Sequence, residues 1–431
     1  MLKRKVETAL KKWKQQKSRD VLFLKGPKGV GKTTLIEQFA KENYKSLIYL
    51  NFETNPIHKS IFFSSLDMAT LTKQITLKLR TSKLIPHETL IFLDEIHLSP
   101  RARLAAKTFI EGNRFDCIIA SSYAGADIDK FDPTPLEHET LVELSSLDFE
   151  EFLWANGVSE KAISDVYEHF TAKKAIPPAL HDELIELFKE YLVIGGMPEV
   201  VNAFINNHDF REAGKIQNRI LRTYEKGIAY HLKKTDRNKV KMCFDSLPAQ
   251  LVKENKKFQY GVVENKGNAR KFESSILWLH DADMVNISFQ LEDLKMPFVA
   301  NARYDIFKIY FKDVGLLTGQ LGPIAQQEII AGRLNVYNYA ILESAIAELL
   351  AKRGRRLFYY TKSTALSMEF VIDYNNKVTA FSANDADNTK AKAMISLFEN
   401  HNLEFGIELT LDNLSVKGNL HRYPLYCIMF I

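Results

Sequence analysis

The sequence predicts an α/β protein in which a parallel sheet is followed by helices, a basic helical module and a second α/β segment. Short apolar runs alternate with stretches of helical periodicity up to residue 145, the pattern of parallel strands joined by helical crossovers. Residues 149–205 have helical periodicity alone, and positive charge is concentrated in residues 211–271. The expected segments are a basic N-terminal helix (1–20), a sheet core (21–145), a helical lid and linker (146–235), a module of short helices (236–320) and a C-terminal α/β domain (321–431).

Composition sets limits on this organisation. The chain has 431 residues, of which 46% are hydrophobic, and a formal net charge of +5, so we expect two to four domains. Cys117, Cys243 and Cys427 have neither metal-binding nor disulfide spacing, so we expect buried, reduced thiols and a cytoplasmic location. The basic residues 1–20 lack the apolar run of a signal peptide, and the apolar residues 423–431 are too few to cross a bilayer.

A glycine-rich loop follows the first apolar run, Val21–Leu24. Residues 26–33 read GPKGVGKT, which matches the GxxxxGK[ST] phosphate-binding loop, or P-loop. Glycines permit backbone dihedrals that turn successive N–H groups toward an anion, and the helix expected from Lys32 adds its positive end. In this loop type Lys32 reaches the terminal phosphates of ATP and the Thr33 hydroxyl ligates Mg²⁺. The predicted nucleotide-binding residues are Gly26, Pro27, Lys28, Gly29, Val30, Gly31, Lys32, Thr33 and Thr34.

An acidic pair ends the apolar run Leu90–Leu93. ATP hydrolysis at a P-loop needs one strand-end acid near the metal and a group that orients or activates water. Asp94 is therefore predicted to orient the Mg²⁺ shell, and Glu95 to act as general base. The predicted catalytic residues are Glu95 and Lys32, and the predicted metal residues are Thr33 and Asp94.

Three further apolar runs complete a predicted five-stranded parallel sheet, at Ser46–Phe52, Asp116–Ala120 and Thr140–Leu144. Five strands suit the class of P-loop protein that inserts a strand between the phosphate strand and the acidic strand. Ser121 and Ser122 follow the fourth run. They either place a hydroxyl near the γ-phosphate or serve as ordinary turn residues.

The basic segment has the order of a winged helix. Residues 211–271 hold 16 Lys and Arg against 6 Asp and Glu, so the net charge of +10 exceeds that of the whole chain. Three short helices are expected at 238–247, 249–254 and 268–279, followed by strand-like residues 284–289. The basic residues around the start of the third helix are Lys266, Arg270 and Lys271. The partner is either double-stranded DNA, held through its phosphates, or a protein, and a solvated face without a partner is the third alternative.

Seven segments resemble, in order, the bacterial and archaeal AAA+-like ATPases that carry a C-terminal domain of unknown function with a restriction-endonuclease-like fold. The resemblance covers nearly the whole chain and rests on GPKGVGKTTL (26–35), LIFLDEIHLSP (90–100), LSSLDFEEFL (144–153), YLVIGGMPEVV (191–201), LPAQLVKENKKFQY (247–260), ARKFESSILWL (269–279) and FKIYFKDVGLL (307–317). It implies nucleotide, metal and hydrolysis roles for Lys32, Thr33, Asp94 and Glu95. It also implies that the helical region broken at 195–198 is the lid over the nucleotide, whereas the residues alone also allow a plain loop between two helices.

The chain departs from the family pattern at two places near the predicted site. Glu137-His138 stands where the family usually has Gly-Arg, so a role for that arginine is not carried over. His97 replaces a common glutamine and is either a sensor or a residue that begins a helix. No arginine finger is assigned, because several candidates qualify: Arg101, Arg103 and Arg114.

The C-terminal segment has the order of the endonuclease-like fold but an incomplete metal site. A helix at 337–350 carries Glu343, and strands are expected at 357–361, 369–373 and 378–381, with a turn at Asn375-Asn376. A metal-dependent nuclease of this fold needs a helix Glu, a strand-end carboxylate and then an acid-x-Lys pair. The first two places hold Glu343 and Glu369, the third reads Ser382-Ala383-Asn384, and replacement lysines are available at Lys390 and Lys392. We expect packing and partner binding here in preference to cleavage.

The sequence therefore predicts a Mg²⁺-dependent ATPase that acts as a nucleotide-driven switch associated with DNA. The alternative is a nucleotide-gated protein-interaction module with little hydrolysis, and an ATP-regulated nuclease is the third reading. An intact Glu95 favours the enzyme, and the missing arginine before the fifth strand favours the interaction module. The sequence leaves the oligomeric state and any base specificity open.

Overall fold

The structure is a computed structural model, and it describes residues 2–16, 20–80, 83–111, 114–122, 137–332, 336–363, 366–383, 394–399 and 403–431. The chain divides into two compact units. Unit 1 comprises residues 3–146 together with 281–283, and unit 2 comprises residues 147–280 and 284–431.

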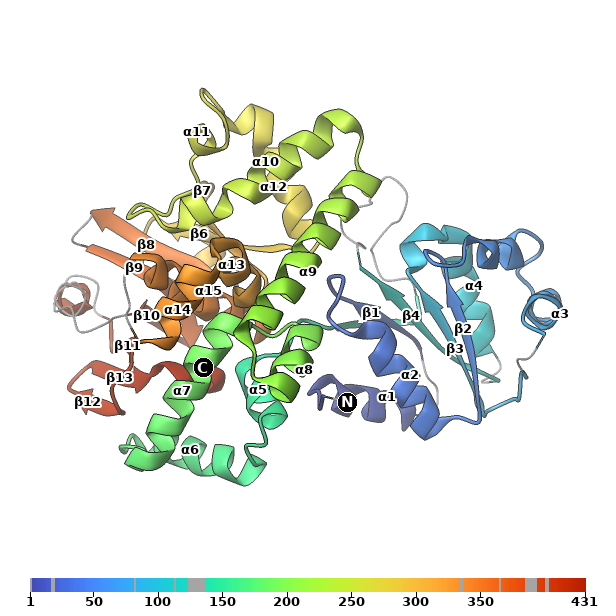
Figure 1. Cartoon of the computed structure of the whole chain (residues 1–431), viewed down its shortest axis with the longest axis horizontal. Helices are drawn as coiled ribbons and strands as arrows, with labels where there is room; N and C mark the ends of the chain where they lie inside the picture. Colours follow the sequence, from blue (N-terminus) through green and yellow to red (C-terminus); the bar gives the residue numbers. More distant parts are fainter. Residues whose placement is uncertain are drawn as a thin grey trace. The chain divides into compact units, whose positions relative to one another are not determined.

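Unit 1 is built on a parallel sheet (Figure 1). Its five strands have the order β2-β3-β4-β1-β5. Its strands are β1 (Val21–Lys25), β2 (Ser46–Asn51), β3 (Thr89–Asp94), β4 (Asp116–Ser121) and β5 (Glu139–Glu143). Its helices are α1 (Val6–Lys14), α2 (Lys32–Asn43), η1 (Pro56–Phe62), α3 (Met68–Lys78), η2 (Ile96–Leu98) and α4 (Pro100–Ile110). β4 lies between the phosphate strand β1 and the acidic strand β3, so the predicted inserted strand and the P-loop fold class are confirmed.

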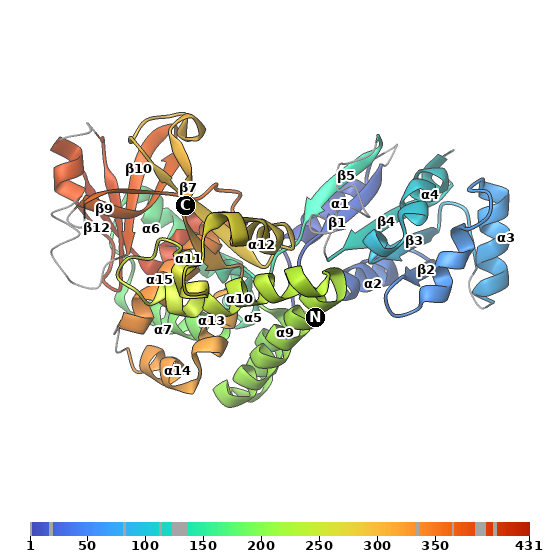
Figure 2. The ribbon, with the colours of Figure 1, turned by 90° about the horizontal axis from the view of Figure 1, so that it is seen from above.

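The crossovers place helices on both faces of this sheet. The chain moves in one direction across the sheet from β1 to β2 and in the other from β3 to β4, so right-handed connections put α2 and α4 on opposite faces. Figure 2 shows this arrangement. The strands β3 and β4 are buried along their whole length, which explains why both read as continuous apolar runs.

Unit 2 begins with a run of helices, and further helices follow residue 313. They are α5 (Phe149–Ala155), α6 (Glu160–Ala172), α7 (Pro178–Ile194), α8 (Pro198–Asn207), α9 (Phe210–His231), α10 (Lys234–Leu251), α11 (Tyr260–Val263), α12 (Ala269–Asp281), α13 (Val314–Leu321), α14 (Pro323–Ile330) and α15 (Val336–Lys352). α5 starts at a capping box in which Asp148 and Glu151 each accept the other's backbone N–H. The predicted break at 195–198 separates α7 from α8, with Gly195 at a φ of 71°.

An eight-stranded sheet completes unit 2, in the order β12-β13-β11-β10-β9-β8-β6-β7. The strands are β6 (Val285–Leu291), β7 (Ala302–Phe311), β8 (Phe358–Ser363), β9 (Leu366–Tyr374), β10 (Lys377–Ala383), β11 (Gly406–Thr410), β12 (Ser415–Lys417) and β13 (Leu420–Pro424), and the short helices η4 (Phe298–Ala300) and η5 (Leu425–Phe430) accompany them. The predicted C-terminal strands and hairpin are confirmed: β9 and β10 are antiparallel, and Asn375 and Asn376 have φ values of 55° and 61° at the turn.

Two expectations about the basic module differ from the structure. Residues 238–247 and 249–254 were expected as two helices, but α10 continues through Pro248 to Leu251. Its buried stripe, which includes Phe244, Leu247 and Leu251, packs on both sides of the proline and outweighs the lost N–H. The antiparallel pair β6–β7 belongs to the same sheet as β8–β13, so no sheet boundary accompanies the predicted division at 320. The winged helix itself remains a prediction.

Cys117, Cys243 and Cys427 are buried and unbonded, as expected. Over the parts of the chain that the structure describes, no helix is both long and apolar enough to cross a membrane.

Candidate functional site

The loop between β1 and α2 is held in shape by its glycines. Gly29 and Gly31 have φ values of 92° and 90°, which residues with a Cβ rarely adopt. Gly26 is required for another reason, since a Cβ there would lie 2.0 Å from the Leu144 carbonyl oxygen. The loop ends where Lys32 begins α2, so the positive end of the helix faces the loop.

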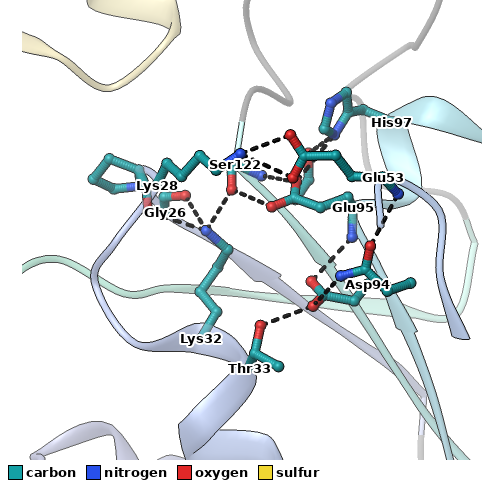
Figure 3. Close-up of polar contacts among 12 residues, drawn as sticks. Gly26, Lys28, Lys32, Thr33, Glu53, Asp94, Glu95, His97 and Ser122 are labelled. Carbon is teal, nitrogen blue, oxygen red and sulfur yellow. Dashed lines mark hydrogen bonds and ion pairs between the residues drawn. The ribbon is translucent and has the colours of Figure 1, made fainter. Parts of the chain in front are cut away.

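The Lys32 ammonium lies at the centre of the loop. It donates to the carbonyl oxygens of Gly26 (2.7 Å) and Pro27 (3.0 Å) and to the Ser122 Oγ (2.9 Å) at the end of β4 (Figure 3). Burial lowers the pKa of Lys32, and the nearby carboxylates of Glu95 and Asp94 oppose this shift. The ammonium thus links the P-loop to the end of a neighbouring strand.

Asp94 joins the loop to the acidic strand. Its Oδ2 accepts hydrogen bonds from Thr33 Oγ1 (2.8 Å), the Tyr49 hydroxyl (3.0 Å) and Asn51 Nδ2 (3.1 Å). Burial and the neighbouring Glu95 raise the pKa of Asp94, while the hydrogen bond from Thr33 lowers it. The adjacent hydroxyl of Thr33 and carboxylate of Asp94 fit Mg²⁺, which prefers one or two carboxylates with phosphate and water oxygens.

Glu95 lies beside Asp94 and faces β4. It has a φ of 53°, an uncommon conformation for a residue with a side chain. Its Oε1 accepts from Ser122 Oγ (2.5 Å) and its Oε2 from Ser122 N–H (3.0 Å). His97 Nδ1 lies 3.4 Å from Glu95 Oε2 and 3.0 Å from Ser121 Oγ (Figure 3). Ser122 therefore touches both predicted catalytic residues, and His97 belongs to the same cluster.

The remaining predicted loop residues differ in how far their side chains are exposed to solvent. Lys28 turns away from the centre and pairs with Glu53 at 2.6 Å. Thr34 is exposed, and Val30 is buried. The structure thus brings Lys32, Thr33 and the acidic pair together, while Lys28 is engaged outside that cluster.

The sequence reasoning missed three residues around this site. Tyr49 and Asn51 contact Asp94 from the strand next to β3, and a polar residue ending an apolar run was the available signal for Asn51. Arg4 is buried and donates to the carbonyl oxygens of Val30 (3.1 Å) and Ser145 (2.6 Å). Nothing in the basic N-terminal stretch distinguished this arginine from its neighbours.

The arginine-finger candidates have different surroundings. Arg101 donates to the carbonyl oxygens of Phe62 (2.7 Å) and Ser64 (2.9 Å). Arg103 is buried and forms a two-point ion pair with Glu139 at the start of β5, with contacts of 2.6 and 3.1 Å. Arg114 is exposed. Of the three, Arg101 and Arg103 support the structure of unit 1 itself.

In unit 2, some of the residues predicted to contact DNA or a metal ion already have partners within the chain. Lys271 pairs with Glu264, whereas Lys266 and Arg270 are exposed. Lys256, Lys308 and the Tyr310 hydroxyl contact the Glu343 carboxylate, and Lys308 is 2.9 Å from it. Burial would raise the pKa of Glu343, but the two lysines hold it well below its usual range.

This lysine pair neutralises the carboxylate that a nuclease would use to hold Mg²⁺. Glu369 lies on β9 and Ser382 on β10, while Asn384, Lys390 and Lys392 lie outside the described residues.

Two family models match parts of the chain. Residues 18–153 match a family described as an AAA domain, and residues 185–327 match one described as a domain of unknown function (DUF8612). The first of these matches includes the P-loop and the acidic pair Asp94-Glu95 of unit 1. No curated protein matches the chain.

Solved structures similar to the chain are distant in sequence. They include the Walker-type ATPase of Pyrococcus abyssi (15% identity, covering 74% of this chain and 96% of that one, TM-score 0.38). They also include the RuvB Holliday junction branch migration motor of Thermotoga maritima (14%, 65% and 86%, TM-score 0.30) and the Drosophila ORC bound to DNA (14%, 77% and 96%, TM-score 0.24). At these scores they carry no information about what this chain binds.

Proposed function

We propose that the chain is an ATP-binding, Mg²⁺-dependent ATPase of the cytoplasm whose nucleotide state acts as a switch. The observation that carries this proposal is the cluster in which Lys32 and Glu95 share Ser122 while Thr33 bonds to Asp94. Ser122 thereby links the P-loop lysine to the proposed general base. The hydrogen bond from Thr33 to Asp94 joins the two residues proposed to hold Mg²⁺.

Each residue has a role that follows from its chemistry. Lys32 and the loop N–H groups bind the terminal phosphates, and Lys32 exchanges its carbonyl partners for phosphate oxygens. Thr33 and Asp94 hold Mg²⁺, which when bound neutralises charge on the phosphate oxygens. Glu95 accepts a proton from the attacking water, and Ser122 keeps the carboxylate oriented until the phosphate reaches the site.

The DNA association is proposed through the basic winged-helix region. α10, α11 and α12 precede the antiparallel pair β6–β7, which is the element order of that module. Lys266 and Arg270 are exposed near the start of α12, and Lys271 would have to leave Glu264 to join them. Contacts of this kind bind phosphates without reading bases.

The alternative is a nucleotide-gated protein-interaction module. Glu137-His138 in place of Gly-Arg favours it, because the arginine expected before the fifth strand is missing. A nuclease is disfavoured, because Lys256 and Lys308 occupy the Glu343 carboxylate.

ATP turnover with and without double-stranded DNA at low salt tests the proposal. The variants are Lys32→Ala and Glu95→Gln, with Lys41→Ala, an exposed lysine on the same helix α2, as the matched control. We expect Lys32→Ala to lose nucleotide binding and Glu95→Gln to bind ATP without turning it over, while Lys41→Ala behaves as wild type. Tight ATP binding by the wild type without turnover would refute the enzyme and leave the interaction module.

A further inference from the structure

The long helix α9 carries a stripe of basic side chains on one face. We define this basic stripe as Arg211, Lys215, Arg219, Arg222 and Lys226, all of which are exposed. Their spacings of four, four, three and four residues keep them on one side of a helix with 3.6 residues per turn. At 1.5 Å per residue the stripe is about 22 Å long. Figure 1 shows α9 as one uninterrupted helix.

The opposite face of α9 is anchored in unit 2. Ile220, Leu221, Tyr224 and Ile228 are buried there, and the Gln217 amide donates to the Val193 carbonyl oxygen at 2.7 Å. The stripe is therefore presented on a fixed backbone, and a partner does not have to order the helix in order to bind it.

Most charges of the stripe have no ion-pair partner among the described residues. Consecutive members three or four residues apart repel one another, which destabilises a helix by about 0.2–0.5 kcal/mol per pair. Arg219 pairs with Glu199, but over the described parts of the chain no acidic residue forms an ion pair with the other four. The acids of α9 are engaged elsewhere: Glu212 accepts from Asn207 (2.7 Å) and Glu225 pairs with Lys241 (2.8 Å). A helix that is only solvated would gain stability from acids placed within the stripe.

We propose that the basic stripe of α9 binds the phosphate backbone of double-stranded DNA. The stripe is linear and cationic, and about 22 Å measured along the duplex axis spans six or seven phosphates of one strand, at about 3.4 Å of axis each. A protein partner would need an apolar or aromatic anchor, and among the described residues of α9 the only exposed large apolar side chain is Tyr230, beyond the end of the stripe. This surface is distinct from the start of α12 and deepens the DNA association proposed above, but it does not depend on ATP hydrolysis.

The test is the salt dependence of duplex binding in the nucleotide-free full chain. A labelled duplex of roughly 20 base pairs is titrated by fluorescence anisotropy between about 50 and 200 mM salt, because each neutralised phosphate contributes about −0.9 to the slope of log K against log salt. Removing two stripe charges with Arg222→Gln and Lys226→Gln should make the slope shallower by about 2. The matched control, Lys161→Gln with Lys174→Gln, removes two exposed lysines in and just after α6 and should leave the slope unchanged.

Two control variants distinguish a loss of DNA binding from a folding defect and from a loss of ATP hydrolysis. The charge-keeping exchange Arg222→Lys with Lys226→Arg should retain the wild-type slope, which excludes damage to the helix. The Lys32→Ala variant should bind the duplex as wild type does, so loss of turnover and loss of DNA binding are scored independently. An unchanged slope in the stripe variant, an equal change in the control variant, or no duplex binding at low salt would each overturn the proposal, and the last would point to an acidic protein.

Discussion

Arg4 allows the most specific prediction about the P-loop. It is buried, and its two terminal nitrogens donate to the carbonyl oxygens of Val30 and Ser145. The peptide that joins Val30 to Gly31 is planar and trans, so its C=O and N–H point in opposite directions. A carbonyl held by Arg4 therefore directs the Gly31 N–H away from Arg4, and we expect that direction to be the one this loop type uses for phosphate.

The magnitude follows from the number of bonds lost. A hydrogen bond to a charged group contributes about 1.5–3 kcal/mol, and the bond to Val30 is the one assigned to the loop. Arg4→Ala should therefore weaken ATP binding about ten- to a hundredfold. Arg4→Lys should lose less, because an ammonium can still reach one of the two carbonyls but lacks the planar fork that reaches both.

The assay is titration with a fluorescent ATP analogue in the presence of Mg²⁺, together with steady-state turnover. We expect KM to rise with kcat little changed, since the loop binds phosphate before and during reaction. Lys12→Ala on α1, an exposed lysine, is the matched control. If Arg4→Ala keeps wild-type ATP affinity in a protein that still unfolds cooperatively, the positioning role is refuted.

Four further outcomes are expected. Glu95→Gln should lower turnover by at least about a hundredfold while ATP still binds, measured by phosphate release and nucleotide titration, because a neutral amide cannot accept the proton from water. Ser122→Ala should lower kcat about tenfold, since it removes a hydroxyl that touches both the P-loop lysine and Glu95, and an unchanged kcat would contradict its role. Glu348 is buried, which raises its pKa from 4.5 to about 7. The folded state therefore binds this proton more tightly than the unfolded state does, and stability falls as pH rises from about 5 to 8. Relative to Glu348→Gln, the wild type should lose about 2 kcal/mol over that range in denaturant unfolding of unit 2, and a parallel pH dependence in both proteins would contradict the assignment. Gly196→Ala should lower the free energy of unfolding by at least about 2 kcal/mol, because its Cβ would lie 2.0 Å from the Leu147 carbonyl oxygen.

The parts of the fold that local physics determines were predictable from sequence. Buried parallel strands read as apolar runs, so β1 to β5 were found, and the strand-loop-helix context identified the P-loop. The strand-end positions of Asp94 and Glu95 followed from the same runs. The Asn375-Asn376 turn followed because asparagine tolerates positive φ.

The contacts that depend on tertiary packing were not predictable in the same way. Arg4 reaches the loop from just before α1, in a stretch where several other basic residues occur, and Lys308 reaches Glu343 from β7, the edge strand of the unit 2 sheet. The predicted break between two helices at Pro248 was wrong, because the buried apolar face of α10 continues on both sides of the proline. Such choices depend on which surfaces meet, and one sequence contains no direct signal for that.

The chain leaves unit 1 close to the P-loop. Leu144 N–H donates to the Lys25 carbonyl oxygen (2.7 Å), so the end of β5 is fixed beside the end of β1. The next residue, Ser145, is fixed by Arg4, which also holds the loop at Val30. The two hydrogen bonds of Arg4 therefore connect the P-loop at Val30 to Ser145, where the chain is about to leave unit 1.

The chain enters unit 2 at Leu147, and two motifs without evident chemistry in the sequence converge on it. Leu147 N–H donates to the Gly196 carbonyl oxygen (2.7 Å), and its own carbonyl oxygen accepts from the Tyr191 hydroxyl (2.9 Å) and Lys352 Nζ (2.8 Å). The Gly196 N–H in turn donates to Asp313 (2.8 Å), so the Gly-Gly-Met-Pro and Lys-Asp-Val-Gly segments are bonded together. Each end of the connection between the units is therefore held by hydrogen bonds within its own unit. Gly196 is therefore explained by its close packing against the Leu147 backbone, and Gly195 by its φ of 71° and its close packing against Asp313 and Gly315.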